Sequence, residues 1–152
     1  MIIKNIFDPV VVDALIDRIN NLTPDTRPQW GKMTADQVLA HLNVSYIMTY
    51  ESTIPKPNWL MQLVLKTVVK QKVVGPTPYG RSTPTAPAFK MAGTKDFNEE
   101  KLKLVAYLQR VAQDGAQKFD GRSSHSFGPL TTAEWNNMFY KHLDHHLTQF
   151  GV

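Results

Sequence analysis

Two histidines, His142 and His146, lie one helical turn apart in the last predicted helix of the chain. Both fall in an apolar stripe that repeats with a period of about 3.6 residues, and side chains at this spacing lie about 5–6 Å apart at Cβ. Buried imidazoles need a hydrogen-bond or metal partner, because an unpaired polar group in a core is costly. The spacing suits one shared metal ion better than two separate hydrogen bonds. The stripe also contains Trp135, Met138 and Phe139, with Leu143 and Phe150 on its flank.

A third histidine, His41, is expected to point inward from the second predicted helix. Asp36 and Asn43 lie about 200 to 220° away around that helix, which predicts a narrow solvent-facing edge there. If the two helices are neighbours, the three rings can meet. Three nitrogen ligands leave coordination positions open, which is typical of catalytic metal sites. The chain has no cysteine, and imidazole suits zinc, nickel, iron or copper without choosing among them.

A metal-free interpretation stays open, in which backbone carbonyls, Ser45 or Tyr46 satisfy three core histidines. The pair in one helix together with the third inward ring favours the metal. His145 lies about 80° from the stripe centre and is expected beside the site or at the surface. His125, in the irregular stretch before the last helix, could approach the site or be solvated. The face of the last helix predicted to meet water contains Asn137, Lys141, Asp144 and Thr148, which excludes Asp144 as a ligand.

Helix-capping residues divide the chain into five predicted helices, and no strand is predicted. Two of the connections between them are irregular stretches, Val74–Thr94 and Ala116–Leu130, and loops of the first length in a compact domain are usually functional or disordered. Amphipathic helices favour an all-α bundle forming one domain over residues 1–152, with the longer stretch as a crossover between two parallel helices. The helices are expected to start near Pro9, Thr34, Asn58, Asp96 and Thr131 and to end near Asn21, Glu51, Gln71, Gly115 and Phe150.

Composition describes an ordinary globular domain of 152 residues with 42% hydrophobic and 20% charged residues. The net charge of +4 indicates a mildly basic surface, and no run of five basic residues occurs, so no nucleic-acid partner is expected. The N-terminal residues lack the pattern of a signal peptide, and the longest apolar stretch, Trp59–Leu65, is too short to span a bilayer. We therefore expect a cytoplasmic protein.

The third predicted helix combines apolar residues with lysines, a pattern found in helices that bind membrane surfaces. We expect no membrane partner, however, because the same apolar residues would be needed to close the bundle. The apolar residues are Trp59, Leu60, Leu63 and Leu65, and the lysines are Lys66, Lys70 and Lys72.

Two segments resemble the DinB/YfiT-like superfamily. The first reads W-x-x-M-T-x-x-Q-x-L-x-H-L over Trp30–Leu42, and the second places H-x-x-x-H in the final helix. The runs F-G-P-L-T-T-A-E-W (Phe127–Trp135) and Y-K-H-L-D-H-H-L-T-Q-F-G-V (Tyr140–Val152) are similar to one largely uncharacterised branch of it. The resemblance covers nearly the whole chain. It implies a four-helix bundle core with an extra helix, and a divalent metal ion held by His41, His142 and His146.

Some superfamily members are metal-dependent thiol S-transferases or thiol-dependent isomerases, so the resemblance implies a small-molecule substrate such as a low-molecular-weight thiol. A metal with open positions would activate that thiol, or water, for transferase or hydrolase chemistry. The two irregular stretches would form the mouth of the site, where Arg81, Lys90 and Lys95 either steer an anionic substrate or are simply solvated. The alternative is a non-catalytic protein that binds a metal or small ligand. Dimerisation is compatible with bundles of this type, but no stripe in the sequence identifies an interface.

Overall fold

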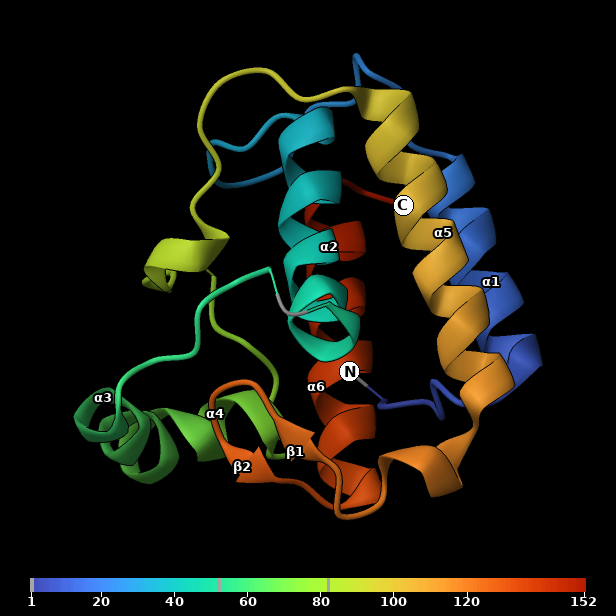
Figure 1. Ribbon diagram of the computed structural model, residues 1–152. Coiled ribbons are helices and arrows are strands. Elements are labelled where there is room, and N and C mark those ends of the chain that lie inside the picture. Colours follow the sequence, from blue (N-terminus) through green and yellow to red (C-terminus); the bar gives the residue numbers. More distant parts are fainter. Residues whose placement is uncertain (1, 52, 82) are drawn as a thin grey trace.

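Four long helices form the core of the protein, which is described by a computed structural model over residues 2–51, 53–81 and 83–152 (Figure 1). They are α1 (Pro9–Asn20), α2 (Ala35–Tyr50), α5 (Phe97–Asp114) and α6 (Thr132–Gln149). Helix α5 packs on both α1 and α2, and α6 also packs on both, so the four helices enclose one hydrophobic core. The predicted all-α class is confirmed.

A shorter helical segment lies to one side of the four long helices. It consists of α3 (Trp59–Val64), a π-helical turn over Leu65–Val69 and α4 (Lys70–Val74). Helix α4 packs on α6, whereas α3 contacts mainly the π-helical turn (Figure 1, lower left). The helix therefore continues past the expected end at Gln71, because the next residue that breaks it is Gly75 followed by proline.

A small hairpin lies between α5 and α6, although no strand was expected from the sequence. Strand β1 (Ser123–Ser124) pairs antiparallel with β2 (Gly128–Pro129) after a 3₁₀ turn at Ala116–Phe119. Two residues per strand are too few to produce an alternating apolar pattern, so sequence periodicity could not reveal it. A second 3₁₀ turn occupies Pro87–Phe89 within the long irregular stretch.

The expected helix starts are confirmed by their capping hydrogen bonds. The Asp8 carboxylate accepts from the backbone N–H of Val10, and Pro9 occupies the first helical position. Thr131 and Glu134 form a reciprocal capping box at the start of α6. Local side-chain chemistry therefore sets where these helices begin.

Helices α2 and α5 run in the same direction, and the long stretch between them is the crossover that the sequence analysis expected. At their starts, the Asp36 carboxylate accepts from the N–H of Lys95 at 2.7 Å. At their ends, the Tyr50 hydroxyl donates to Asp114 at 3.0 Å. This connection carries the chain from α4 past the start of α2 before α5 begins (Figure 1).

Asn43 does not lie on a solvent-facing edge, so that expectation is wrong. Its side chain is fully buried, and its amide donates to the backbone carbonyl of Glu100 at 2.9 Å and to the Glu100 carboxylate at 2.7 Å. Helix α5 covers this side of α2, and the amide is accommodated because α5 supplies two acceptors.

Lys141 was also expected to face water, and this too is wrong. Its side chain is completely buried, and its ammonium group donates to the backbone carbonyls of Lys72, Gly75 and Thr77 at 3.0, 2.6 and 2.8 Å. The end of α4 and the residues after it cover this side of α6. Asp144 is half-buried and pairs with Arg18 at 2.7 Å.

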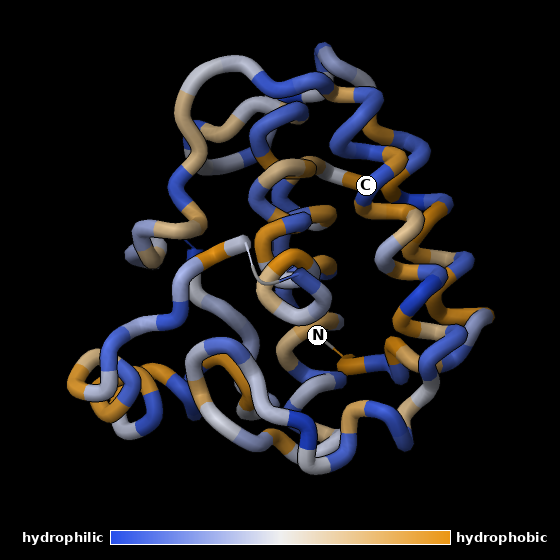
Figure 2. Tube along the Cα trace, in the orientation of Figure 1, coloured by the Kyte–Doolittle hydropathy of each residue, from blue (hydrophilic) through white to orange (hydrophobic). Residues whose placement is uncertain are grey.

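The apolar residues of α3 do not close the core, in contrast to the expectation from the sequence. Trp59, Leu60 and Leu63 are all exposed, and no residue of α3 is buried. Figure 2 shows this apolar segment outside the packed helices. Among the described residues, no helix is long and apolar enough to cross a membrane.

Candidate metal centre

The structure brings His41 of α2 and His142 and His146 of α6 into one cluster. One ring nitrogen from each residue lies within 4.8 Å of those of the other two. The Nε2 atoms of His41 and His142 are 2.9 Å apart, and the ring centroids of His41 and His146 are 4.5 Å apart. His41 and His146 are buried and His142 is half-buried. The predicted convergence of these rings is confirmed.

Each of the three rings is oriented by a hydrogen bond to its Nδ1 atom. His41 Nδ1 lies 2.8 Å from the backbone carbonyl of Phe89, and His146 Nδ1 lies 2.7 Å from the Gln149 side-chain oxygen. His142 Nδ1 lies 3.0 Å from the Ser45 hydroxyl. A carbonyl oxygen can only accept, so His41 carries its proton on Nδ1 and leaves the Nε2 lone pair free; the same holds for His146. Such outer hydrogen bonds are the usual means of orienting metal-ligating histidines.

Burial keeps the three rings uncharged. Desolvation is the main cause that lowers the pKa of His41 below 6.5, with a smaller contribution from the neighbouring His145. It lowers the pKa of His146 to about 3, and it depresses that of His142 strongly, where the nearby histidines add to the effect. Neutral imidazoles are the form that binds a metal ion, so the cluster is prepared for one at neutral pH.

The close approach of two Nε2 atoms requires a proton or a cation between them, since two bare lone pairs would repel each other. Without a metal, the Ser45 hydroxyl can donate to His142 Nδ1, and His142 Nε2–H can then donate to His41. With a metal, all three rings carry the proton on Nδ1 and direct Nε2 to the ion. Ser45 can serve either state because its hydroxyl can donate or accept.

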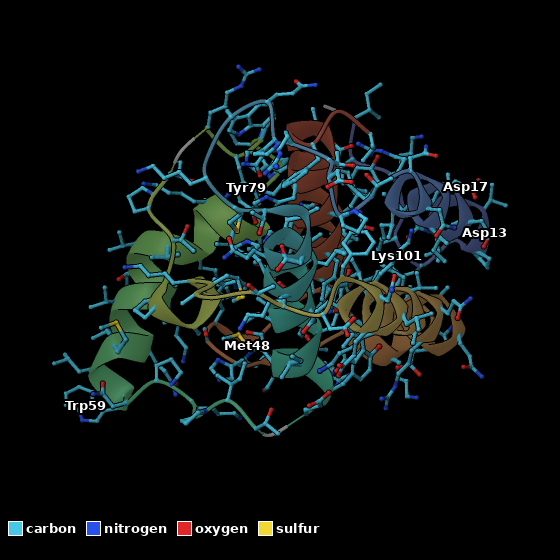
Figure 3. The ribbon with its side chains drawn as sticks, turned by 90° about the horizontal axis from the view of Figure 1, so that it is seen from above. Asp13, Asp17, Met48, Trp59, Tyr79 and Lys101 are labelled. Carbon is cyan, nitrogen blue, oxygen red and sulfur yellow. The ribbon has the colours of Figure 1, made fainter. Side chains whose placement is uncertain are left out.

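Aromatic side chains surround the cluster. The Phe89 ring lies 5.4 Å from the ring of His41 and 5.7 Å from that of His142. The ring centroid of His145 lies 5.0 Å from that of His146 and within 6 Å of those of both Trp30 and Tyr79. Figure 3 shows Tyr79 beside α6, seen from above. His145 thus lies next to the three histidines, as one of the two sequence expectations for it stated.

A residue that the sequence analysis missed is Gln149. Its side chain bonds His146 through Oε1 and donates through Nε2 to the backbone carbonyl of Trp30 at 2.6 Å. Gly31 follows with a φ of 84°, and a Cβ there would lie 2.5 Å from the Gln149 amide nitrogen. Gln149 lies three residues after His146 and therefore on the same face of the helix. This spacing could have identified it from the sequence.

The remaining candidates lie farther from the cluster. His125 bonds the Ser126 hydroxyl and the Ile54 carbonyl, which ties the β1–β2 hairpin to the chain before α3. Arg81 is exposed and stacks on Trp30, with its guanidinium carbon 4.3 Å from the ring centroid. Arg81 therefore lies beside one of the aromatic residues that contact His145.

One family matches almost the whole chain. It is described as "Protein of unknown function (DUF1569)" and matches residues 9–151. The chain belongs to the DUF1569 family. The searches of curated proteins and of solved structures gave no match. The three clustered histidines of this DUF1569 protein lie inside the matched region.

Proposed function

We propose that this DUF1569 protein is a metal-dependent enzyme of the DinB-like superfamily. A divalent ion would be held by His41, His142 and His146 in a DinB-like four-helix bundle, and the substrate would be a small molecule such as a low-molecular-weight thiol. The observation that carries the proposal is the set of three buried rings, each fixed at Nδ1, whose remaining nitrogens converge within 4.8 Å. Three protein ligands match the number found in catalytic zinc sites.

When bound, such an ion supplies Lewis acidity that lowers the pKa of a coordinated thiol or water. Residues of the chain itself would orient the three ligand rings and bind the substrate. Phe89 and Ser45 hold the rings of His41 and His142, and Gln149 holds that of His146, so no reorientation is needed when a ligand arrives. Arg81, exposed beside Trp30, provides a positive charge for an anionic group of the substrate.

Metal analysis of a tag-free preparation tests the site. We expect close to one first-row divalent ion per chain in the wild type and almost none in His41→Ala. His125→Ala is the matched control, because it removes an imidazole outside the cluster and should keep the ion. Equal metal content in the wild type and His41→Ala would disprove the site.

Activity is tested separately on the metal-loaded protein. A panel of low-molecular-weight thiols with electrophiles, and of hydrolysable esters, should reveal turnover in the wild type that is absent in His142→Ala. Bound metal without turnover above His142→Ala would refute the enzyme while leaving the metal site intact.

A non-catalytic metal-binding or ligand-binding protein is the second candidate. It is favoured by the burial of His41 and His146, which leaves these two rings little exposed surface for a substrate. This function predicts that metal raises the melting temperature without producing turnover.

A further inference from the structure

An apolar surface covers α3 and the π-helical turn. None of the residues in these two elements is buried. Figure 3 shows Trp59 at the outer end of α3, pointing away from the rest of the protein. We call this surface the α3 patch. It consists of Trp59, Leu60, Met61, Leu63, Val64 and Val68, whose exposed fractions lie between 44% and 78%.

The patch belongs to the most basic part of the chain. Residues 52–95 contain seven of the 17 lysines and arginines and none of the 13 acidic residues. The rest of the chain then has ten basic and 13 acidic residues, so the net positive charge comes from this region alone. Lys56, Lys66 and Lys72 are exposed around the patch, whereas Lys70 pairs with Glu134 at 2.9 Å. A partner of this surface should therefore be both apolar and anionic.

We propose that the α3 patch docks on the surface of an anionic lipid membrane. Trp59 and the aliphatic side chains would enter the boundary between head groups and acyl chains, and the lysines would lie at the level of the phosphates. A helix of this kind lies in the interface and does not cross the bilayer. The expectation of no membrane partner required these side chains to be in the core, and the structure removes that reason.

A second copy of the chain fits the patch less well. In a symmetric dimer the same surface meets itself, so the lysines around one patch would face those around the other. These like charges repel each other and disfavour a symmetric dimer through this surface. Anionic phospholipids supply both the apolar phase and the opposite charge.

The base of the docking segment is held firmly on the protein. Lys141 and Asn137 of α6 donate to the backbone carbonyls of Lys72 and Val74 at 3.0 and 2.9 Å. The Lys70–Glu134 ion pair adds a contact to the start of α6. These contacts fix the end of the segment on the bundle, and the patch lies on the part of the segment that extends away from it.

Co-sedimentation with lipid vesicles tests the proposal on the full chain. We expect binding to phosphatidylcholine vesicles containing about one-third phosphatidylserine, and at least about tenfold weaker binding to phosphatidylcholine alone or at high salt. Trp59 is the most exposed tryptophan, so its fluorescence should shift to shorter wavelength on binding. Trp59→Phe should keep most of the binding and lose the shift. No binding to either kind of vesicle would overturn the proposal.

Variants with matched controls separate the apolar and the electrostatic parts. Trp59→Ser combined with Leu63→Ser should reduce binding by more than about tenfold, whereas Leu102→Ser, an equally exposed apolar site on α5, should not. The triple change Lys56→Gln, Lys66→Gln and Lys72→Gln should reduce binding to anionic vesicles by more than about tenfold. Its control carries Lys4→Gln, Lys32→Gln and Lys103→Gln, which removes the same charge elsewhere and should bind normally.

Size-exclusion chromatography tests whether a second copy of the chain covers the α3 patch instead of a membrane. The wild type should elute as a monomer without vesicles, and unchanged melting temperatures should show that the variants fold. A dimer that disappears in the Trp59→Ser, Leu63→Ser variant would assign the patch to a second copy and overturn the membrane proposal. Full binding of that variant to anionic vesicles would overturn it as well.

Discussion

Two neighbouring sides of α6 bury polar side chains in different ways. On one side, the Lys141 ammonium has three hydrogens and three carbonyl acceptors, so its bonding capacity is filled by the protein itself. On the other side, one ring nitrogen each from His41, His142 and His146 lies at one centre, where either a proton or a cation can sit between His41 and His142. The lysine holds the chain after α4 in place, whereas the histidines leave a centre that a cation can fill. A buried polar group thus indicates a functional site only when the protein does not complete its bonding.

Lys141→Met gives the largest expected effect on stability and tests the first half of this comparison. The change keeps the length of the side chain but leaves three buried carbonyls without a donor. The free energy of unfolding should fall by about 3 kcal/mol, since each unsatisfied group costs roughly 1–3 kcal/mol and some regain water. Urea unfolding measures the loss. Metal content should stay at the wild-type value, and a loss of metal would show that the two sides are not independent.

Acidification of the metal-free protein should lower its free energy of unfolding, because the folded state keeps His146 neutral. The pKa of His146 is about 3 in the folded protein and near 6.5 in the unfolded chain, so the unfolded state binds the proton first. Stability from this residue is complete above about pH 6.5 and falls as the pH drops. Between about pH 8 and pH 5 the free energy of unfolding should decrease by about 2 kcal/mol from His146 alone.

Chemical denaturation at the two pH values measures this decrease. Bound metal should oppose it, because the ion competes with the proton for the same lone pairs. A free energy of unfolding that is the same at both pH values would contradict buried, neutral histidines.

Gln149→Leu tests whether orientation of the rings matters. The change removes the acceptor for His146 Nδ1 but leaves all three ligands, so metal affinity should fall by about 10- to 100-fold without being abolished. Competition with a chelator of known affinity measures the change. Gln113→Leu, on the far side of the protein beside α1, is the matched control and should bind metal normally. Unchanged affinity in Gln149→Leu would limit Gln149 to anchoring the loop at Trp30.

Ser45→Ala is the smallest of these perturbations. The hydroxyl is a weaker acceptor than a carbonyl, and water can replace it because His142 is only half-buried. Metal affinity should fall by no more than about tenfold. A loss as large as that of His41→Ala would mean that Ser45 has a direct part in binding.

The sequence predicted the features that depend on local chemistry. Capping residues such as Asp8 and Thr131 located the helix starts, and the helical period placed His41, His142 and His146 on inward faces. These predictions succeeded because a cap or a stripe is determined within a few residues.

The features that failed depend on which element covers which face. The polarity of Asn43 and Lys141 suggested solvent, but α5 and the chain after α4 supply acceptors that no local pattern shows. The apolar side chain of Trp59 suggested the core, yet α3 lies outside it. The carbonyl of Phe89 beside His41 comes from a stretch without periodicity, so only the three-dimensional structure could reveal it.

The order of the helices has a consequence for how the cluster forms. His41 and His142 are 101 residues apart in the chain, and α6 is the last helix. During synthesis, α2 leaves the ribosome long before its partner rings exist, and no nascent chain that ends before α6 can gather them. Cation binding at this centre would therefore report a folded chain that has been synthesised at least through α6, and a chain that stops before α6 would lack it.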